Sequence, residues 1–354
     1  MHKIGFVVFP GFNLMGFAAV NVFETANLAL DAMTGAVVGA SADAPGETPA
    51  RTPAYTVTLL SETGGFVSCS AGFRVETQPF DDAVFDTIMF GSGVEIDVTS
   101  PALTAFVRRS LDTARRVVAP CTGAFVLAEA GVLDGRRATT HWRFAPELQR
   151  RFPKVIVEDD QIFVVDGPVW TSAGMTATID LALAMVENDY GLEVARMAAR
   201  KLVVYHRRAG GQAQVSALLA LEPKSDRIQT AIDYAGANLG KALSVEVLAE
   251  AARLSPRQFS RAFKLETGQS PAKAVERLRV EAARLMLEQG RHSMDVIARE
   301  VGLVDRERMR RAFLRTLGQS PQEIRQVGRA NRYHALPEPA GVFSADSKDG
   351  LAKI

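Results

Sequence analysis

The chain has 354 residues, a length typical of two domains, with 47% hydrophobic and 23% charged residues. No apolar run approaches the ~18 residues of a membrane span, and the first apolar stretch breaks at Pro10, so we expect neither a membrane partner nor a signal peptide. Two cysteines, Cys69 and Cys121, exclude a disulfide framework and a zinc site, and they predict a cytoplasmic protein without metal or cofactor.

Apolar runs of strand length alternate with helical patterns from the N-terminus to about Tyr190. In chain order, the predicted strands are 4–9, 55–60, 87–90, 117–120, 138–141, 161–165 and 169–172. The predicted helices are 19–31, 101–114, 123–130 and 177–190. This alternation indicates an α/β domain with a flavodoxin-like, mostly parallel sheet covered on both faces. Ligands of such sheets bind at the carboxyl ends of the strands.

One strand end carries a candidate nucleophile. The strand 117–120 runs into Cys121-Thr122-Gly123 and then into a helix, which is the shape of a nucleophile elbow. A cysteine there would point into a pocket at a helix N-terminus, where the dipole favours the thiolate. His141, at the end of another predicted strand, could meet it across the pocket.

The residues allow two interpretations of Cys121. It is either the nucleophile of a cysteine hydrolase or amidotransferase, or a small residue that faces a bound ligand. No carboxylate is a convincing partner for His141, because Glu24, Glu129 and Asp180 better suit helix or local structure. We therefore favour a binding site without catalysis.

The segment 205–225 breaks the pattern between the two halves with Gly210-Gly211, and we predict a linker there, with a short helix over 213–221. The predicted domains are accordingly 1–204 and 226–328. Residues 39–53 are predicted to form a surface loop, and residues 329–354, which show no periodicity, a disordered tail.

Charge is distributed unevenly along the chain. Residues 224–333 hold 21 Lys and Arg against 13 Asp and Glu, a net charge of +8, whereas the whole chain has +1. A basic segment joined to an acidic one is typical of a DNA-binding module attached to another domain, although a solvated helical surface would have the same charge.

The basic segment contains an internal repeat. Residues 257–271 and 307–321 are identical at seven of 15 positions at an offset of 50, and Val247-Leu248-Ala249 aligns with Val296-Ile297-Ala298 at an offset of 49. With only two copies, the segment is a tandem module and not a solenoid.

Each copy predicts a short helix, a tight turn and a basic helix, which is the order of a helix-turn-helix. The short helices are predicted over 244–252 and 293–301, and the basic helices begin after Ser255 and Asp305. A continuous helix over 271–289 would hold the two basic helices about one DNA turn apart, ~34 Å. Their polar faces carry Arg257, Ser260, Arg261 and Lys264 in the first copy and Arg306, Arg310 and Arg311 in the second. Each cation can contact a phosphate or a base edge.

Residues 226–328 resemble the DNA-binding domain of the AraC/XylS family through both units, the linking helix and both GxSP endings. The resemblance implies that Arg257, Ser260, Arg261, Arg306, Arg310 and Arg311 face promoter DNA. Two residues depart from the family pattern: Arg253 replaces a turn glycine, and Leu303 replaces a phenylalanine.

The front domain resembles the PfpI/class I glutamine amidotransferase-like superfamily, and the whole arrangement resembles GlxA-type regulators. The resemblance rests on Gly91-Ser92-Gly93, on the run 121–142 and on the run 170–183. Thr122 stands where PfpI-type peptidases have His, and 11–16 lacks a carboxylate, so the resemblance implies a non-enzymatic sensor. It further implies a small, often nitrogen-containing effector, an activator that works with RNA polymerase, and a homodimer formed through the N-terminal domain.

The predicted effector pocket consists of Asn13, Gly93, Cys121, Thr122, His141, Trp142 and Met175. Trp142 could hold a cation over its ring, although a single tryptophan is more often a core residue. Three hypotheses follow: a ligand-controlled DNA-binding regulator, a hydrolase fused to a DNA-binding domain, and a DNA-binding protein whose front domain only dimerises.

Overall fold

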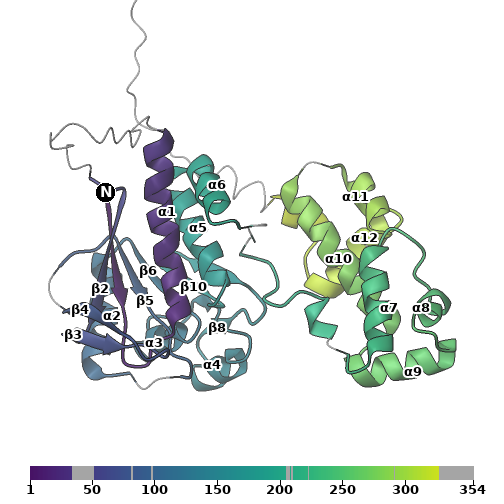
Figure 1. Cartoon of the computed structure of the whole chain (residues 1–354), viewed down its shortest axis with the longest axis horizontal. Helices are drawn as coiled ribbons and strands as arrows, with labels where there is room; N and C mark the ends of the chain where they lie inside the picture. Colours follow the sequence, from purple (N-terminus) through teal and green to yellow (C-terminus); the bar gives the residue numbers. More distant parts are fainter. Residues whose placement is uncertain are drawn as a thin grey trace, which may run out of the picture.

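The computed structural model describes residues 1–33, 52–80, 83–96, 99–204, 208, 210–221, 223–290 and 292–326. Figure 1 shows an N-terminal α/β body and a C-terminal helical body. They are joined by a connecting segment, of which residues 208, 210–221 and 223–225 are described. Most of the predicted loop 39–53 and the whole predicted tail 329–354 lie outside the described residues. No helix in the described ranges has both the length and the apolar character needed to cross a membrane.

The N-terminal body contains an eight-stranded sheet with the order β3-β4-β2-β1-β5-β6-β10-β9. Its strands are β1 (His2–Val7), β2 (Tyr55–Ser61), β3 (Thr63–Ser68), β4 (Arg74–Pro79), β5 (Thr87–Phe90), β6 (Arg116–Pro120), β9 (Phe163–Asp166) and β10 (Val169–Ser172). Strands β2, β1, β5, β6 and β10 pair in parallel, in the order that flavodoxin-like sheets have. The predicted fold class is confirmed.

Three strand predictions differ from the structure. β1 lies two residues before the predicted 4–9, and β9 begins two residues and ends one residue after the predicted 161–165. Of the predicted strand 138–141, only Ala138 is in a strand, as part of β7 (Arg137–Ala138), which pairs with β8 (Ile156–Val157). The prediction for 139–141 is wrong because Thr140 turns its hydroxyl to the carbonyl oxygen of Cys121, 2.8 Å away. Strands β3 and β4 escaped prediction because Gly64-Gly65 and a polar β4 leave little apolar alternation at this edge.

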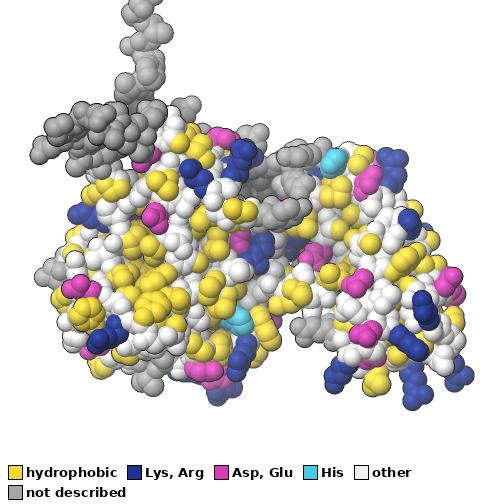
Figure 2. Space-filling view, in the orientation of Figure 1, with side chains coloured by type: hydrophobic (Ala, Val, Ile, Leu, Met, Phe, Trp, Pro, Cys, Tyr) yellow, Lys and Arg dark blue, Asp and Glu magenta, His cyan; other side chains and the backbone are white. Residues whose placement is uncertain are grey.

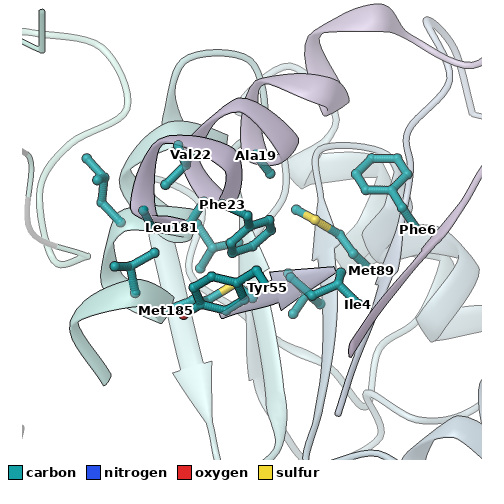
Figure 3. Packing of buried hydrophobic residues seen from close by; sticks show 14 of the residues in the cluster. Ile4, Phe6, Ala19, Val22, Phe23, Tyr55, Met89, Leu181 and Met185 are labelled. Atoms are coloured by element: carbon teal, nitrogen blue, oxygen red, sulfur yellow. The ribbon is translucent and has the colours of Figure 1, made fainter. Parts of the chain in front are cut away.

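Helices cover both faces of the sheet. One face packs on α1 (Ala18–Met33), α5 (Ala177–Tyr190) and α6 (Leu192–Lys201); Figure 3 shows Phe23 of α1 and Leu181 and Met185 of α5 beside Ile4 and Tyr55 of the sheet. The other face packs on α2 (Pro101–Thr113) and α3 (Gly123–Glu129). Alternate strand residues divide between the two clusters, as in a sheet buried on both sides. α6 and the short α4 (Ala145–Arg151) were not predicted.

A buried ion-pair cluster lies at the end of the sheet where the parallel strands begin. Asp189, near the end of α5, accepts a hydrogen bond from the Tyr55 hydroxyl at 2.8 Å and pairs with Arg115 at 2.7 Å and with the buried Arg116. The Arg116 guanidinium also donates to the Thr87 hydroxyl at 2.8 Å. The cluster ties β2, β5 and β6 to α5, opposite the edge where ligands bind.

The C-terminal body contains two helical clusters around one long helix. Its helices are α7 (Asp226–Ala237), α8 (Val245–Ala251), α9 (Pro256–Thr267), α10 (Pro271–Gln289), α11 (Met294–Glu300) and α12 (Arg306–Leu317). The first half of α10 packs with α7, α8 and α9, and its second half packs with α11 and α12. The duplicated helix-turn-helix is therefore present with the predicted continuous linking helix, while α7 was not predicted.

Local chemistry explains where these helices begin and turn. Ser244, Ser255, Ser293 and Asp305 each accept a hydrogen bond from a backbone N–H of the first turn, as N-cap residues do. The helix predicted over 213–221 is wrong except for the 3-10 turn Leu219–Leu221. Residues 210–214 instead pair with residues 160–163 in an extended conformation.

Candidate functional site

Five of the seven predicted pocket residues follow strands at the carboxyl edge of the eight-stranded sheet, and the other two follow β7 of the separate two-stranded sheet. Asn13 follows β1, Gly93 follows β5, Cys121 and Thr122 follow β6, His141 and Trp142 follow β7, and Met175 follows β10. The parallel order places the ends of β1, β5, β6 and β10 along one edge, where α/β sheets bind ligands.

Hydrogen bonds join several of these loops directly. The Asn13 backbone N–H donates to the Ser92 carbonyl oxygen at 2.6 Å, and the Thr122 hydroxyl donates to the Gly93 carbonyl oxygen at 3.2 Å. The Asn13 side-chain oxygen accepts from the Met15 N–H at 2.8 Å, capping the turn before α1. The loops after β1, β5 and β6 therefore form one bonded unit.

Cys121 occupies the strained turn that the elbow pattern predicts. Its φ is +52°, in the left-handed region that residues other than glycine rarely adopt. Gly174 must be glycine here, because a Cβ at that position would overlap the Cβ of Cys121. A Cβ at Gly123 would lie 2.7 Å from the Phe90 carbonyl oxygen. The turn is built by close backbone approach on both sides.

The chemistry of Cys121 is that of a thiol and not of a thiolate. The side chain is buried, and burial raises its pKa to about 11 despite a backbone hydrogen bond that acts in the opposite direction. The direction of this pKa shift is opposite to the one expected from the position of Cys121 at a helix N-terminus, because loss of solvation outweighs the backbone hydrogen bond. A neutral thiol is a poor nucleophile.

His141 has no carboxylate among the described residues to orient it. Burial and the neighbouring Arg143 lower its pKa, so the imidazole is neutral at physiological pH, and its Nδ1 accepts from the Arg143 N–H at 3.3 Å. The three candidate acids are committed elsewhere or exposed. Asp180 binds Arg208, Glu129 pairs with Arg151, and Glu24 is exposed on α1. The constellation lacks an activated nucleophile and an oriented base.

Large apolar side chains surround this edge and remain exposed. Trp142 is 55% exposed, Val94 54%, Met175 43% and Leu14 37%. The interpretation of Trp142 as a core residue is wrong, because it lies on a loop that leaves the sheet. Leu14 and Val94 escaped prediction, since single exposed apolar residues carry no periodic signal. The neighbouring loops also carry Glu95, which lies 4.0 Å from Arg143.

The connecting segment is bonded to the same edge. The Gln214 side-chain nitrogen donates to the Thr140 carbonyl oxygen at 2.7 Å, and its side-chain oxygen accepts from the Trp142 N–H at 2.7 Å. Further along, the Ala217 N–H donates to Glu281 of α10 at 2.6 Å, and Gln212 donates to Glu288 of α10. Hydrogen bonds thus run from the candidate pocket to the long helix of the C-terminal body.

The basic face of α9 is open to solvent. Arg257, Arg261 and Lys264 are exposed and form no salt bridge with any described residue, while Ser260 is half-buried. Phe259 and Phe263 hold the opposite face in the core. Figure 2 shows Lys and Arg side chains projecting from the end of the C-terminal body where α9 lies. This face can approach an anion without first breaking an ion pair.

The corresponding face of α12 is basic but internally paired. Arg306 contacts Asp295 at 2.6 Å, Arg310 contacts Glu307 at 2.9 Å, and Arg311 lies 3.5 Å from Glu307. All three arginines are exposed. The two basic helices therefore differ in how readily their cations reach a partner.

A hollow of about 440 Å³ beside α12 collects further cations. It is lined by Arg308, Arg311 and Arg315 of α12, by Arg279 and Glu276 of α10, of which Glu276 pairs with Arg315, and by the turn at Gly302. Guanidinium groups grouped in this way suit phosphate oxygens. Arg279, Arg308 and Arg315 were missed, because helical spacing alone does not show which arginines share a hollow.

Comparison with known proteins follows the same division. The helix-turn-helix domain family matches residues 248–326, and the DJ-1/PfpI family matches residues 49–188. The HTH-type transcriptional regulator ArgR of Pseudomonas aeruginosa is 31% identical over 231 residues, which cover 65% of this chain and 70% of that protein. The HTH-type transcriptional regulator CdhR of Pseudomonas aeruginosa is 28% identical over 343 residues, 91% of each chain.

One enzyme is also similar. Isonitrile hydratase of Pseudomonas putida is 35% identical over 140 residues, which cover 38% of this chain and 60% of that enzyme. CdhR and ArgR, which cover 91% and 65% of this chain, are named as regulators, whereas the likeness to the enzyme extends over little more than a third of it.

Proposed function

This chain belongs to the AraC-type helix-turn-helix transcriptional regulators that carry a DJ-1/PfpI domain, and from that premise we propose that a small nitrogen-containing metabolite, bound in the N-terminal domain, controls it. The protein is a DNA-binding regulator and not an enzyme. We propose three things beyond this: the class of its ligand, the residues that contact DNA and the direction of control.

The proposed DNA contacts rest on the basic face of α9, whose cations are exposed and form no salt bridge with any described residue. Arg257, Arg261 and Lys264 would meet promoter DNA from this face, with Ser260 between them. Arg306, Arg310 and Arg311 of α12 would exchange their carboxylate partners for DNA in the neighbouring groove. The rigid α10 connects the two units and sets their spacing.

The side chains at the carboxyl edge of the N-terminal sheet support the class of effector. Trp142 presents an exposed aromatic ring, on which a cationic nitrogen can lie. Glu95 contributes a carboxylate to the neighbouring loop. Apolar Leu14, Val94 and Met175 suit the carbon skeleton of the same molecule. An organic ammonium compound satisfies all three features, with Asn13, Gly93, Cys121, Thr122 and His141 forming the floor.

The connecting segment supplies a physical route for the signal. A ligand that moves the 139–142 loop changes the hydrogen bonds that Gln214 makes with Thr140 and Trp142. Because residues 212–217 also bind Glu281 and Glu288, that change reaches α10. The ligand would shift the population of arrangements of the two domains by its difference in affinity for them.

The remaining parts of the proposal follow family membership. We place the protein in the cytoplasm as an activator that works with RNA polymerase, and as a homodimer formed through its N-terminal domain. The domain limits are 1–204 and 226–328, joined by 205–225. The edge strand β3, with its exposed Phe66, is available for contact between two copies.

Two measurements on the full-length protein test this function. A thermal-shift screen of amino acids, amines and quaternary ammonium compounds should find a compound that raises the unfolding midpoint. Fluorescence anisotropy with promoter DNA, with and without that compound, should then show two different affinities or two different transcription levels. A protein that no such compound stabilises would instead use its front domain for dimerisation only.

A further inference from the structure

A cavity of about 580 Å³ lies between the connecting segment and α10, and none of the predicted N-terminal pocket residues lines it. Asp160 and residues 212–217 form one wall, and α10 with the end of α12 forms the other. Its volume falls within the ~300–1,000 Å³ of small-molecule sites. Both domains contribute to it, so a molecule bound there touches both.

The carboxylates of this cavity already have hydrogen-bond or ion-pair partners. The donors are the Gln214 N–H for Asp160 at 3.3 Å, the Ala217 N–H for Glu281 at 2.6 Å and the Arg315 guanidinium for Glu276. Arg284, another cation of the wall, is paired with Glu288 at 3.0 Å. Each of these groups therefore already has a partner within the protein.

Two cations of the cavity have no such partner. Lys273 and Arg277 lie one turn apart on α10, and their side chains form neither a hydrogen bond nor a salt bridge with any residue that the structure describes. Arg277 is half-buried and is attracted by Asp160 and Glu281 without contacting either. A half-buried guanidinium retains several N–H donors that a carboxylate can accept.

Apart from Gln212 and Thr316, the rest of the lining is apolar. Val215 of the connecting segment faces the cavity together with Val280 and Leu285 of α10 and Leu317 of α12. Burying an apolar body against such a wall is favourable, whereas a small inorganic anion would leave it uncovered. The lining therefore suits a molecule with a carboxylate at one end and an apolar group at the other.

We propose that this cavity is a second ligand site, which takes a small amphipathic carboxylate. Arg277 and Lys273 bind the carboxylate, and Val215, Val280, Leu285 and Leu317 enclose the apolar part. Because the ligand contacts residues 212–217 and α10 together, it stabilises the arrangement of the two domains in which the cavity is closed.

Isothermal titration calorimetry of the full-length protein with 3-phenylpropanoate tests the proposal. 3-Phenylpropan-1-ol and 3-phenylpropylammonium share its apolar body but lack its negative charge. We expect the carboxylate alone to bind, and Arg277→Gln to weaken its binding about tenfold through loss of a charge-assisted hydrogen bond. Ala213→Trp, which fills the cavity, should abolish binding. Arg196→Gln, on the exposed surface of α6, is the matched control and should change nothing.

Several results would overturn the proposal. These are equal binding of the alcohol or the ammonium compound, unchanged affinity in Arg277→Gln, and the absence of binding heat up to the solubility limit of the carboxylate. Thermal unfolding of each variant verifies that it is folded, and the charge variant still decides the question if Ala213→Trp is not. None of these outcomes depends on promoter DNA or on the N-terminal pocket, so they leave the proposed function untouched.

Discussion

The side-chain amide of Gln214 donates to the carbonyl oxygen of Thr140 at 2.7 Å, and the Thr140 hydroxyl in turn donates to the carbonyl oxygen of Cys121 at 2.8 Å. A residue of the connecting segment is thus two hydrogen bonds away from the strained turn of the candidate pocket. The same segment reaches α10 through Ala217.

Gln214→Leu should therefore separate ligand binding from the DNA response. It removes the hydrogen bonds of the side-chain amide while keeping the size of the side chain. DNA affinity without effector should therefore stay within about twofold of that of the unmodified protein. The ratio of affinities with and without effector should fall toward one. Anisotropy titrations with promoter DNA measure this ratio. Gln229→Leu, on the exposed face of α7, is the control, and a full effector response in Gln214→Leu would contradict the route.

The two basic helices should contribute unequally to DNA binding. Arg261→Ala in α9 should weaken specific binding roughly ten- to hundredfold and reduce the salt dependence, because this arginine has no ion pair to lose. Arg310→Ala in α12 should cost less affinity, because Glu307 already holds that side chain. Glu307→Gln should increase non-specific affinity, since it frees Arg310 and Arg311. Equal losses for Arg261 and Arg310 would show that the ion pairs do not matter.

Arg253 should destabilise the first helix-turn-helix. It has φ +53° at the turn where the second unit has Gly302, with φ +73°. Arg253→Gly should raise the free energy of unfolding by about 0.5–1 kcal/mol, because the left-handed conformation is strained for any residue with a Cβ. Gly302→Ala should lower it by at least ~2 kcal/mol, since the new Cβ would overlap the Leu239 carbonyl oxygen. Thermal midpoints that move in the same direction for both variants would contradict the argument.

Asp189 should make the N-terminal domain sensitive to acid. Burial alone would raise its pKa, but Arg116, the Tyr55 hydroxyl and Arg115 outweigh burial and hold the pKa below its usual value. A carboxylate with a lowered pKa in the folded state stabilises the fold above its unfolded pKa of ~3.9, and this stabilisation disappears as pH falls through the folded pKa.

Asp189→Asn should therefore lower stability at neutral pH by about 3–5 kcal/mol, because it leaves buried Arg116 without its anion. The stability of the variant should also depend less on pH below about 4. Urea unfolding between pH 3 and 7 measures both effects. Asp134→Asn removes an exposed pair with Lys154 and should change stability by less than ~0.5 kcal/mol. If the Asp189→Asn variant kept the same acid sensitivity, other carboxylates would be responsible for it.

Cys121 should react slowly with alkylating agents. Its pKa of about 11 leaves little thiolate at neutral pH, in contrast to a free cysteine with a pKa of ~8.5. In a Cys69→Ser background, iodoacetamide should label the folded protein far more slowly than free cysteine at pH 7.5. Mass spectrometry over time measures the rates. Labelling as fast as that of free cysteine would indicate an activated thiolate and reopen the question of catalysis.

Much of the C-terminal domain could be predicted because its information is local. The caps Ser255 and Asp305, the i, i+4 spacing of Phe259 and Phe263, and the ending glycines all act within a few residues. The repeat then added an independent check. For the same reason the elbow at Cys121 was predictable, since a strand, a strained residue and a helix follow each other in the chain.

Contacts between distant residues decided the rest. Asp189 meets Tyr55 across 134 positions, and Gln214 meets Thr140 across 74, and no periodic pattern marks either pair. Whether the Cys121 thiol ionises depended on how much of it the fold buries, and the ion pair of Arg306 depended on Asp295 of the neighbouring helix α11. Local spacing specifies caps, turns, amphipathic faces and ion pairs within one helix, whereas burial and pairing between elements are properties of the packed chain, so only the tertiary structure could reveal a neutral thiol, an ion pair between α11 and α12 and a cavity between two domains.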